Sequence, residues 1–267
     1  MTPQLGRFEY QRSVAETYDE TRAASPSVLG PLRDCLAGAP GRELADIGGG
    51  TGNYAAALRD ADGFEPLVVD ASREMLSHAA AKGLRTLEAD AQALPLPDAS
   101  FDAVTVISML HHVPDWRAAM AEARRILRPG GRLAHKGFAR DHAAVFWPLG
   151  YFPSSREWFD RTHPSIAEKL EQLPGAGVAP IRFDDLDDAS LAALSRRPER
   201  VLEAGREGRT SFFGRLRLDA PEELERGLDA LERDLRGGRH PDLEPEVVDA
   251  RELLGDAVLV CWTKPAV

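Results

Sequence analysis

The stretch LADIGGGTGNYAAAL, residues 44–58, places Asp46 two positions before three consecutive glycines and then continues as a run of small residues. The apolar residues around Asp46 predict a short buried strand, and the residues from Asn53 onward predict a helix. A glycine-rich turn between a strand and a helix lets the backbone approach a ligand closely, with helix N–H groups directed at it. The stretch therefore predicts a cofactor-binding loop, and the residues that follow must decide which cofactor binds.

Short apolar runs alternate with helical patterns from about residue 43 to residue 138. The apolar runs are ELADI, PLVVD, LRTLEAD, FDAVTVI and GRLAHKGF. One helical pattern between them places Trp116, Met120, Ala123 and Leu127 on a single face. Such alternation is typical of a parallel sheet covered by helices on both faces. We expect the late apolar run AVLVCWT, residues 257–263, to return to this sheet.

The chain after this region has a different pattern. Residues 142–159 carry six of the eighteen aromatic residues and are interrupted by two prolines, which excludes a simple surface helix. A later helix is predicted in DAPEELERGLDALERDLRGG, with Asp219 as its N-cap and a stripe of leucines at positions 224, 228, 231 and 235. We expect an N-terminal helical lid over residues 1–40, an α/β core over residues 41–141, 175–185 and 255–267, and a helical and aromatic cap over the substrate site from residues 142–174 and 186–254.

The composition is that of an ordinary globular protein, with 43% hydrophobic and 28% charged residues among 267 and a net charge of −10. No apolar run approaches the ~20 residues that span a bilayer, and the N-terminus lacks the features of a signal peptide. We therefore expect a cytoplasmic protein with no membrane partner. Its acidic surface repels a phosphate backbone, which favours a small-molecule substrate over nucleic acid. The oligomeric state stays open.

The two cysteines, Cys35 and Cys261, lie far apart in the sequence and lack the spacing of metal ligands. A disulfide framework and a zinc site both require patterns that this chain does not have. We interpret both cysteines as buried small hydrophobic residues.

The glycine loop by itself fits two classes of cofactor. The dinucleotide fingerprint G-x-G-x-x-G would need its last glycine at position 53, where the chain has Asn53, so a nicotinamide oxidoreductase becomes the weaker alternative. Asp70, at the end of VVD, offers a carboxylate to both hydroxyls of a ribose in either class. Asp90, in LEAD, discriminates better, because its carboxylate can accept a hydrogen bond from an adenine amino group while Ala91 adds a backbone donor.

Six motifs then follow one another in order: YDETR, LADIGGGTGN, VVDASREML, ADAQALPLPDASFDAV, ISMLHHVPD and RRILRPGGRL. In this series, over residues 18–136, the chain resembles the class I S-adenosylmethionine-dependent methyltransferases, in particular the group that includes the ubiquinone and menaquinone biosynthesis enzymes. The resemblance implies S-adenosyl-L-methionine as the cofactor. It also implies a Rossmann-like, doubly wound α/β fold with a mostly parallel seven-stranded sheet, to which the helical cap is added.

The resemblance also implies roles for individual residues. The methionine moiety would lie among Asp46, Gly48, Gly50 and Asn53, with Ser108 facing its amine through the backbone and Tyr18 and Arg22 reaching its carboxylate from the lid. The ribose would bind Asp70, the adenine face Ala71 and Met75, and the adenine edge Asp90 and Ala91. Met75 fits the hydrophobic core equally well. Gly49, where many relatives carry cysteine, is a departure that we expect to cost little, because this residue contributes mainly backbone.

The pair His111-His112 in MLHHVPD follows the fourth predicted strand, where the methyl group should emerge. A histidine with a pKa near neutrality can take a proton from the attacking hydroxyl or amine, and His112 is the better candidate of the two by its position in the motif. The alternative is that one histidine of the pair packs against the lid and caps the next helix. Alignment alone also lowers the barrier greatly, so a base is optional.

A metal site is a further alternative, because His112, His142 and His163 could converge with Asp141. Metal-dependent catechol-type methyltransferases carry acidic ligands after the fourth strand, where this chain has Met109-Leu110-His111. We therefore expect no metal.

The sequence thus predicts a methyltransferase that moves the methyl group of S-adenosylmethionine to an oxygen or nitrogen of a small aromatic or hydrophobic metabolite, by direct displacement at the sulfonium carbon. The alternative is a homologue that binds S-adenosylmethionine but has a non-methylating or regulatory role.

Overall fold

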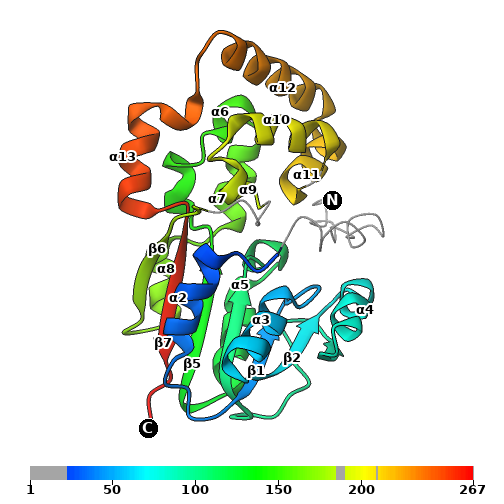
Figure 1. The fold of residues 1–267 in the computed structure, drawn as a ribbon, viewed down its shortest axis with the longest axis vertical. Helices are drawn as coiled ribbons and strands as arrows, with labels where there is room; N and C mark the ends of the chain where they lie inside the picture. The colour runs from blue at the N-terminus through cyan, green and yellow to red at the C-terminus, as the bar shows by residue number, and fades with distance from the viewer. Residues whose placement is uncertain (1–22, 185–189, 209, 267) are drawn as a thin grey trace.

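The alternating apolar runs form one seven-stranded sheet in the computed structural model, which describes residues 23–184, 190–208 and 210–266 (Figure 1). The spatial order is β3-β2-β1-β4-β5-β7-β6. The bounds are β1 Glu43–Ile47, β2 Glu65–Asp70, β3 Arg85–Glu88, β4 Phe101–Ile107, β5 Leu127–Gly137, β6 Gly177–Ile181 and β7 Ala257–Thr263. Strands β1 to β5 run parallel, whereas β7 pairs antiparallel with both β5 and β6. The Rossmann-like α/β class is confirmed, and the sheet is mixed.

The chain order reverses at β1, which has β2 on one side and β4 on the other. In open α/β sheets, ligands bind outside the carboxyl ends of the strands at such a switch point. The glycine loop leaves β1 at this place, directly before α3 (Asn53–Asp62). The fold therefore brings the loop to the position where the sheet can hold a cofactor.

Helices cover both faces of the sheet because the strands alternate their side chains between the two faces. On β4, Val104 and Val106 belong to the cluster that includes α5 (Trp116–Ile126), whereas Ala103 belongs to the opposite cluster with α2 (Pro26–Leu36). The predicted face of α5 is buried at Trp116, Met120 and Ala123, whereas Leu127, predicted on the same helix face, is the first residue of β5. The remaining helices of this part are α4 (Arg73–Ala81), which contacts β2 and β3, and α8 (Ile166–Gln172), which contacts α5.

A layer of helices lies beyond the carboxyl ends of β4 and β5 (Figure 1). It comprises α6 (Pro148–Tyr151), α7 (Ser155–Thr162), α9 (Leu191–Leu194), α10 (Pro198–Glu207), α11 (Ser211–Asp219), α12 (Pro221–Arg236) and α13 (Pro245–Leu254), with the 3-10 turns η2 (Arg140–Ala144) and η3 (Pro241–Leu243). The aromatic residues after position 142 form its own hydrophobic cluster, in which Phe146, Phe152, Phe159 and Phe213 are fully buried. We call this layer the cap. The 3-10 turn η1 (Leu110–His112) follows β4 and belongs to the core, where Leu110 packs in the main cluster.

The expected N-cap of the long cap helix is wrong. Asp219 is the last residue of α11, where its carboxylate lies 3.5 Å from Arg215 Nη1, and the N-cap of α12 is Ala220. Pro221 sets the start, because a proline at the first helical position needs no N–H partner. The leucine stripe itself is present, with Leu224 and Leu228 buried in the cap cluster.

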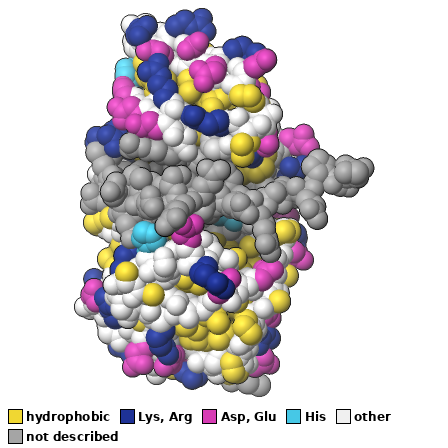
Figure 2. Space-filling view, turned by 90° about the vertical axis from the view of Figure 1, so that its right-hand side faces the viewer, with side chains coloured by type: hydrophobic (Ala, Val, Ile, Leu, Met, Phe, Trp, Pro, Cys, Tyr) yellow, Lys and Arg dark blue, Asp and Glu magenta, His cyan; other side chains and the backbone are white. Residues whose placement is uncertain are grey.

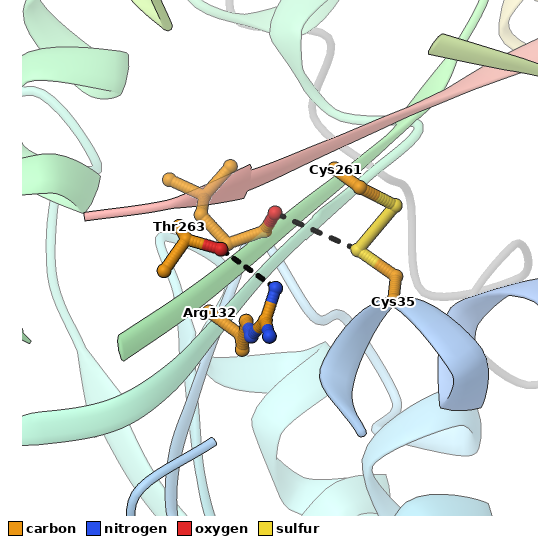
Figure 3. The surroundings of a disulfide bond; sticks show 5 residues. Cys35, Arg132, Cys261 and Thr263 are labelled. Carbon is orange, nitrogen blue, oxygen red and sulfur yellow. Dashed lines mark hydrogen bonds between the residues drawn. A yellow bond between two sulfur atoms is a disulfide. The ribbon is translucent and has the colours of Figure 1, made fainter. Parts of the chain in front are cut away.

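The interpretation of the two cysteines as unpaired is also wrong. Cys35 on α2 and Cys261 on β7 form a disulfide, with their Cα atoms 5.6 Å apart across a separation of 226 residues (Figure 3). Arg132 Nη1 on β5 donates to Thr263 Oγ1 close by, at 2.6 Å. The disulfide therefore ties α2, the first helix of the described residues, to β7, although the two cysteines lie far apart in the sequence.

The surface in Figure 2 carries acidic and basic side chains interspersed over the described residues of that face. None of the helices within the described ranges is both long enough and apolar enough to cross a membrane.

Candidate functional site

The glycine loop turns sharply because three of its residues adopt left-handed backbone conformations. Gly48, Gly50 and Gly52 have φ of +66°, +57° and +74°. The amides of Gly48 and Gly49 donate to Val69 O on β2, at 2.7 and 3.2 Å. A Cβ at position 48 would lie 2.7 Å from the side chain of Met109, so only glycine fits this approach. The loop is thus fixed against β2, with its open side toward the carboxyl ends of the strands.

Asp46 is a buried carboxylate directly before the loop, 1% exposed. Thr105 Oγ1, on the neighbouring strand β4, donates to its Oδ1 at 2.7 Å. Burial raises the pKa of Asp46 to about 6; the Thr105 hydrogen bond opposes the shift, and the charge of Asp70 adds to it. The carboxylate therefore has a hydroxyl as its hydrogen-bond donor and a strong electrostatic reason to accept a cationic ligand.

Gly49 leaves the space that this carboxylate occupies. A Cβ at position 49 would come within 2.7 Å of Asp46 Cγ and 2.9 Å of Val68 Cγ1. Real Cβ atoms do not approach so closely, so a side chain here would displace Asp46 or the loop. This backbone therefore suits glycine at position 49 and has no room for a side chain, whereas the small cost expected for the departure from cysteine stays a prediction.

Asp70 ends β2 and holds the loop from the other side. Its Oδ2 accepts from Gly50 N at 2.9 Å and its Oδ1 accepts from Ser72 N at 2.8 Å. Burial raises the pKa of Asp70, and the backbone donors Ser72, Gly50 and Ala71 oppose that shift. Each carboxylate oxygen can accept further hydrogen bonds, which fits the predicted contacts to two ribose hydroxyls.

The residues predicted for the adenine lie around the next two loops. Met75, in the first turn of α4, is 3% exposed yet joins none of the hydrophobic clusters that the described residues form, and Ala71 is exposed beside it. Asp90 follows β3 in the loop, where its Oδ1 accepts from Gln92 N at 2.9 Å. Ala91 is 7% exposed and points its side chain into the main cluster, which leaves its backbone for the predicted role.

Ser108 follows β4 in a conformation that is uncommon for a residue other than glycine, with φ of +53°. Its amide donates to Lys136 O at 2.8 Å, and Lys136 Nζ donates to its Oγ at 3.2 Å. Strained backbone of this kind gathers at functional sites, where the surrounding structure must hold it. The bonds to β5 hold Ser108 beside the glycine loop.

Asn53 is engaged behind the loop. Lys82 Nζ, at the end of α4, donates to Asn53 Oδ1 and to Thr51 O, both at 2.7 Å. Sequence reasoning missed Lys82, because nothing near it in the chain marks it as a partner of residues about thirty positions away. Tyr18 and Arg22, predicted to reach the cofactor carboxylate, lie outside the described residues.

The two histidines predicted to lie where the methyl group emerges are in η1, directly after β4, with ring centroids 3.9 Å apart. His163, at the end of α7 in the cap, stacks on His111 at 5.0 Å and an interplanar angle of 12°. Burial lowers the pKa of His112 to about 4 and that of His163 to about 3, and the pKa of His111 lies well below its ordinary value for the same reason. His112 nevertheless retains an exposed surface. The rings are therefore neutral at neutral pH.

His142 does not join this group through hydrogen bonds. Its Nδ1 accepts from Ala139 N at 3.0 Å, and its Nε2 lies 3.3 Å from Leu254 O. Within the residues that the structure describes, no three His, Cys, Asp or Glu side chains are arranged to hold a metal ion.

Comparisons with known proteins agree with this geometry. A family model for a methyltransferase domain matches residues 45–135. A demethylmenaquinone methyltransferase of Thermus thermophilus is 45% identical over 142 residues, covering 51% of this chain and 62% of that protein. A 27-O-demethylrifamycin SV methyltransferase of Amycolatopsis mediterranei is 35% identical over 129 residues, covering 44% and 47%. The chain thus spans less than two thirds of the length of either relative.

A solved structure from Anabaena variabilis, described as a candidate methyltransferase of an antibiotic biosynthesis pathway, has a TM-score of 0.74 and 27% identity. The match covers 91% of this chain and 98% of that one, so it includes the cap as well as the sheet. Residues 45–135 are a class I S-adenosylmethionine-dependent methyltransferase domain that resembles the ubiquinone and menaquinone biosynthesis enzymes, and S-adenosylmethionine is its cofactor.

Proposed function

We propose that the protein transfers the methyl group of S-adenosylmethionine to an oxygen or nitrogen of a small aromatic or hydrophobic metabolite. The proposal rests on the position of Asp46, Asp70 and Ser108 at the carboxyl ends of three neighbouring strands, where the glycine loop also lies. Thr105 joins the first of these to β4, and the amide of Gly50 joins the second to the loop. Three neighbouring strands thus present two carboxylates and one strained backbone turn to the same place.

These residues fit the cofactor chemically. Asp46 is a buried carboxylate whose raised pKa marks an environment that favours a neighbouring positive charge, and S-adenosylmethionine carries an ammonium and a sulfonium. Asp70 offers acceptors suited to vicinal hydroxyls, and Met75 adds a buried apolar side chain in the first turn of the helix that follows. The bound cofactor supplies an electrophilic methyl group.

The acceptor side lies between η1 and the cap. His112 presents an exposed, neutral imidazole, which is the form that can accept a proton from a hydroxyl or an amine. The cap above it is built from aromatic side chains, among them Phe138, which is edge-on to His163 at 6.0 Å. An aromatic or hydrophobic metabolite suits such surroundings. The names of the rifamycin and antibiotic-pathway relatives support a role in secondary metabolism.

The division of the chain remains part of the proposal. Residues before α2 would close over the cofactor carboxylate through Tyr18 and Arg22, and the cap would close over the metabolite. α2 itself packs on β5 and β7, and α8 on α5, so we assign both helices to the core.

The test measures methyl transfer from radiolabelled S-adenosylmethionine to a panel of hydroquinones, phenols and aromatic amines. A second assay uses a broad metabolite extract as the source of acceptors. We expect label in one class of acceptor. Asp70→Ala should abolish labelling at low cofactor concentration, because charge-assisted hydrogen bonds contribute about 1.5–3 kcal/mol each. The matched control is Asp60→Asn, a charge removed from the exposed side of α3, which should label normally. Tight binding of the cofactor with no labelled product in any mixture would favour the non-methylating alternative.

A further inference from the structure

We propose that His163 is a positioning residue of the methyl-acceptor site, a cap side chain whose ring holds His111 and, through it, His112. The inference rests on the proposed function and adds a residue to it. His163 belongs to the end of α7, whereas the two histidines of η1 belong to the core. The contact between them is therefore a direct link between the cap and the place where the substrate must lie.

A continuous stack of rings carries the proposal. Phe159 stacks on His163 at 4.3 Å and 18°, His163 stacks on His111 at 5.0 Å and 12°, and His111 lies against His112 at 3.9 Å and 43°. Phe159 is 1% exposed and His163 is 4% exposed, so one end of the stack is anchored in the cap core. His112, at the other end, is exposed. The stack therefore packs against the inner side of the pair and supports the imidazole of His112, which is the ring that can contact a substrate.

Hydrogen bonds fix the ring of His163 and its tautomer. Its Nδ1 lies 3.1 Å from Phe159 O and 3.0 Å from Thr162 Oγ1. The hydroxyl of Thr162 donates its own hydrogen to Trp158 O at 2.8 Å, and a carbonyl can only accept, so Nδ1 must carry the proton. His163 is therefore held as a neutral Nδ1–H imidazole, whose orientation is set by its own helix and not by the substrate.

The charges around the stack also favour neutral rings. The groups that act on His111 are His112, His163, Lys136 and Lys169, and those that act on His163 are Lys169, His112 and His142. Lys169, on α8, is 2% exposed, and its Nζ donates to Phe138 O at 2.6 Å, while Asp141 partly offsets its charge. Burial is the main cause that opposes protonation of both rings; Lys136 on β5 adds to it at His111, and Lys169 on α8, whose own pKa burial lowers to about 7, adds to it at both rings where it is charged. Stacking of neutral imidazoles therefore persists at neutral pH.

Two substitutions separate the stacking role from proton chemistry. His163→Phe keeps a flat ring that can stack on His111 but removes both nitrogens, and His163→Ala removes the ring. We expect His163→Ala to lower kcat on the order of tenfold to a hundredfold, because a displaced catalytic group loses alignment. The affinity for S-adenosylhomocysteine should stay within about twofold, since His163 is assigned to the acceptor side and not to the cofactor site. His163→Phe should retain most of kcat. Equal losses in the two variants would overturn the stacking role.

A second readout does not depend on turnover. NMR titration of histidine ring carbons should show the lowered pKa of His112 rising toward the ordinary histidine value in His163→Ala, because loss of the stack admits water to the inner side of the His111–His112 pair, which the stack covers. The same pKa should stay low in His163→Phe. An unchanged His112 titration in folded His163→Ala would overturn the proposal even if no substrate is found, whereas a shifted titration without any methyl product would support the stack and contradict the proposed function.

A matched control and a second variant guard against general loss of folding. His142→Phe removes another buried imidazole from the same region, outside the stack, and should leave the His112 titration unchanged. A shift as large as in His163→Ala would overturn the specific role of His163. If His163→Ala does not fold, Phe159→Leu can be used, because it removes the outer ring of the stack and should also raise the pKa of His112. A folded Phe159→Leu variant without that rise would overturn the proposed role of His163.

Discussion

Cofactor binding should release a proton from Asp46 below about pH 6. The carboxyl group is 1% exposed, and burial raises its pKa to about 6 in the free protein. A cationic ligand beside a carboxylate favours the ionised form, so the complex should hold this group deprotonated. The free protein then binds more protons than the complex in this range. Affinity for S-adenosylmethionine should therefore be full above pH 6 and be lost as the pH falls.

The size of the effect follows from the single pKa. With a value of about 6 in the free protein and a much lower one in the complex, affinity should fall about tenfold between pH 7 and pH 5, or about 1.4 kcal/mol. Proton release should approach about one per site at pH 5. Thr105→Val removes the hydrogen bond that lowers this pKa, so the midpoint of the loss should move above pH 6.

The assay is titration calorimetry at pH 5, 6 and 7 in pairs of buffers that differ in ionisation enthalpy, which counts the protons released. The amino group of the cofactor, with an ordinary α-amino pKa of about 7.7–8.0, is protonated at pH 5 and 6 and contributes only slightly at pH 7. Asp46→Asn should bind more weakly than the unsubstituted protein at pH 7, with an affinity that no longer varies with pH. A flat profile in the unsubstituted protein would refute the reasoning. If the affinity of Asp46→Asn varied with pH as much as that of the unsubstituted protein, the released proton would come from another group, such as Asp70, whose pKa is also raised.

Three further predictions concern stability and turnover. The pKa of Asp46 is higher in the folded protein than in the unfolded chain, so protonation of Asp46 stabilises the folded protein at low pH. This contribution to the free energy of unfolding, on the order of 3 kcal/mol, should be lost as the pH rises from about 4 to about 6. Chemical denaturation at several pH values should show the loss, and Asp46→Asn should lack it. Cys35→Ser should lower that free energy by about 2–4 kcal/mol under non-reducing conditions, and the unsubstituted protein, denatured without reductant, should titrate no free thiol; two free thiols would contradict the disulfide. His112→Ala should lower kcat far more than cofactor affinity, and an acidic limb near pH 4 should vanish from the pH–rate profile; an unchanged kcat would assign His112 to packing.

Much of the sheet could be predicted from the sequence because its signals are local. The runs FDAVTVI and AVLVCWT coincide with β4 and β7, since each is a short apolar run bounded by polar residues. The start of β5 could not be found in the same way. It begins at Leu127, which pairs with Phe101 across a register shift, and that pairing depends on the neighbouring strand. Pro129-Gly130-Gly131, a sequence typical of turns, therefore lies inside the strand.

The contacts that sequence analysis missed all join residues far apart in the chain. Cys35 contacts Cys261 because α2 packs on β7, and no spacing rule covers a separation of 226 residues. The stack of His163 on His111 depends on where α7 lies over η1, which is set by the packing of the whole cap. The sequence contains each of these residues, but only the fold shows which of them are in contact.

Asp46 illustrates the same limit within the predicted site. The motif predicts its position before the glycine loop, but its protonation depends on neighbouring residues that lie outside the motif. Thr105 lies 59 residues away, and its hydroxyl keeps the pKa from rising further, whereas the charge of Asp70 pushes it up. Gly49 contributes by lacking a Cβ, since any side chain there would occupy the space of the carboxylate. The sequence therefore predicts where the cofactor binds, whereas the pH at which it binds tightly follows from three contacts that only the folded chain brings together.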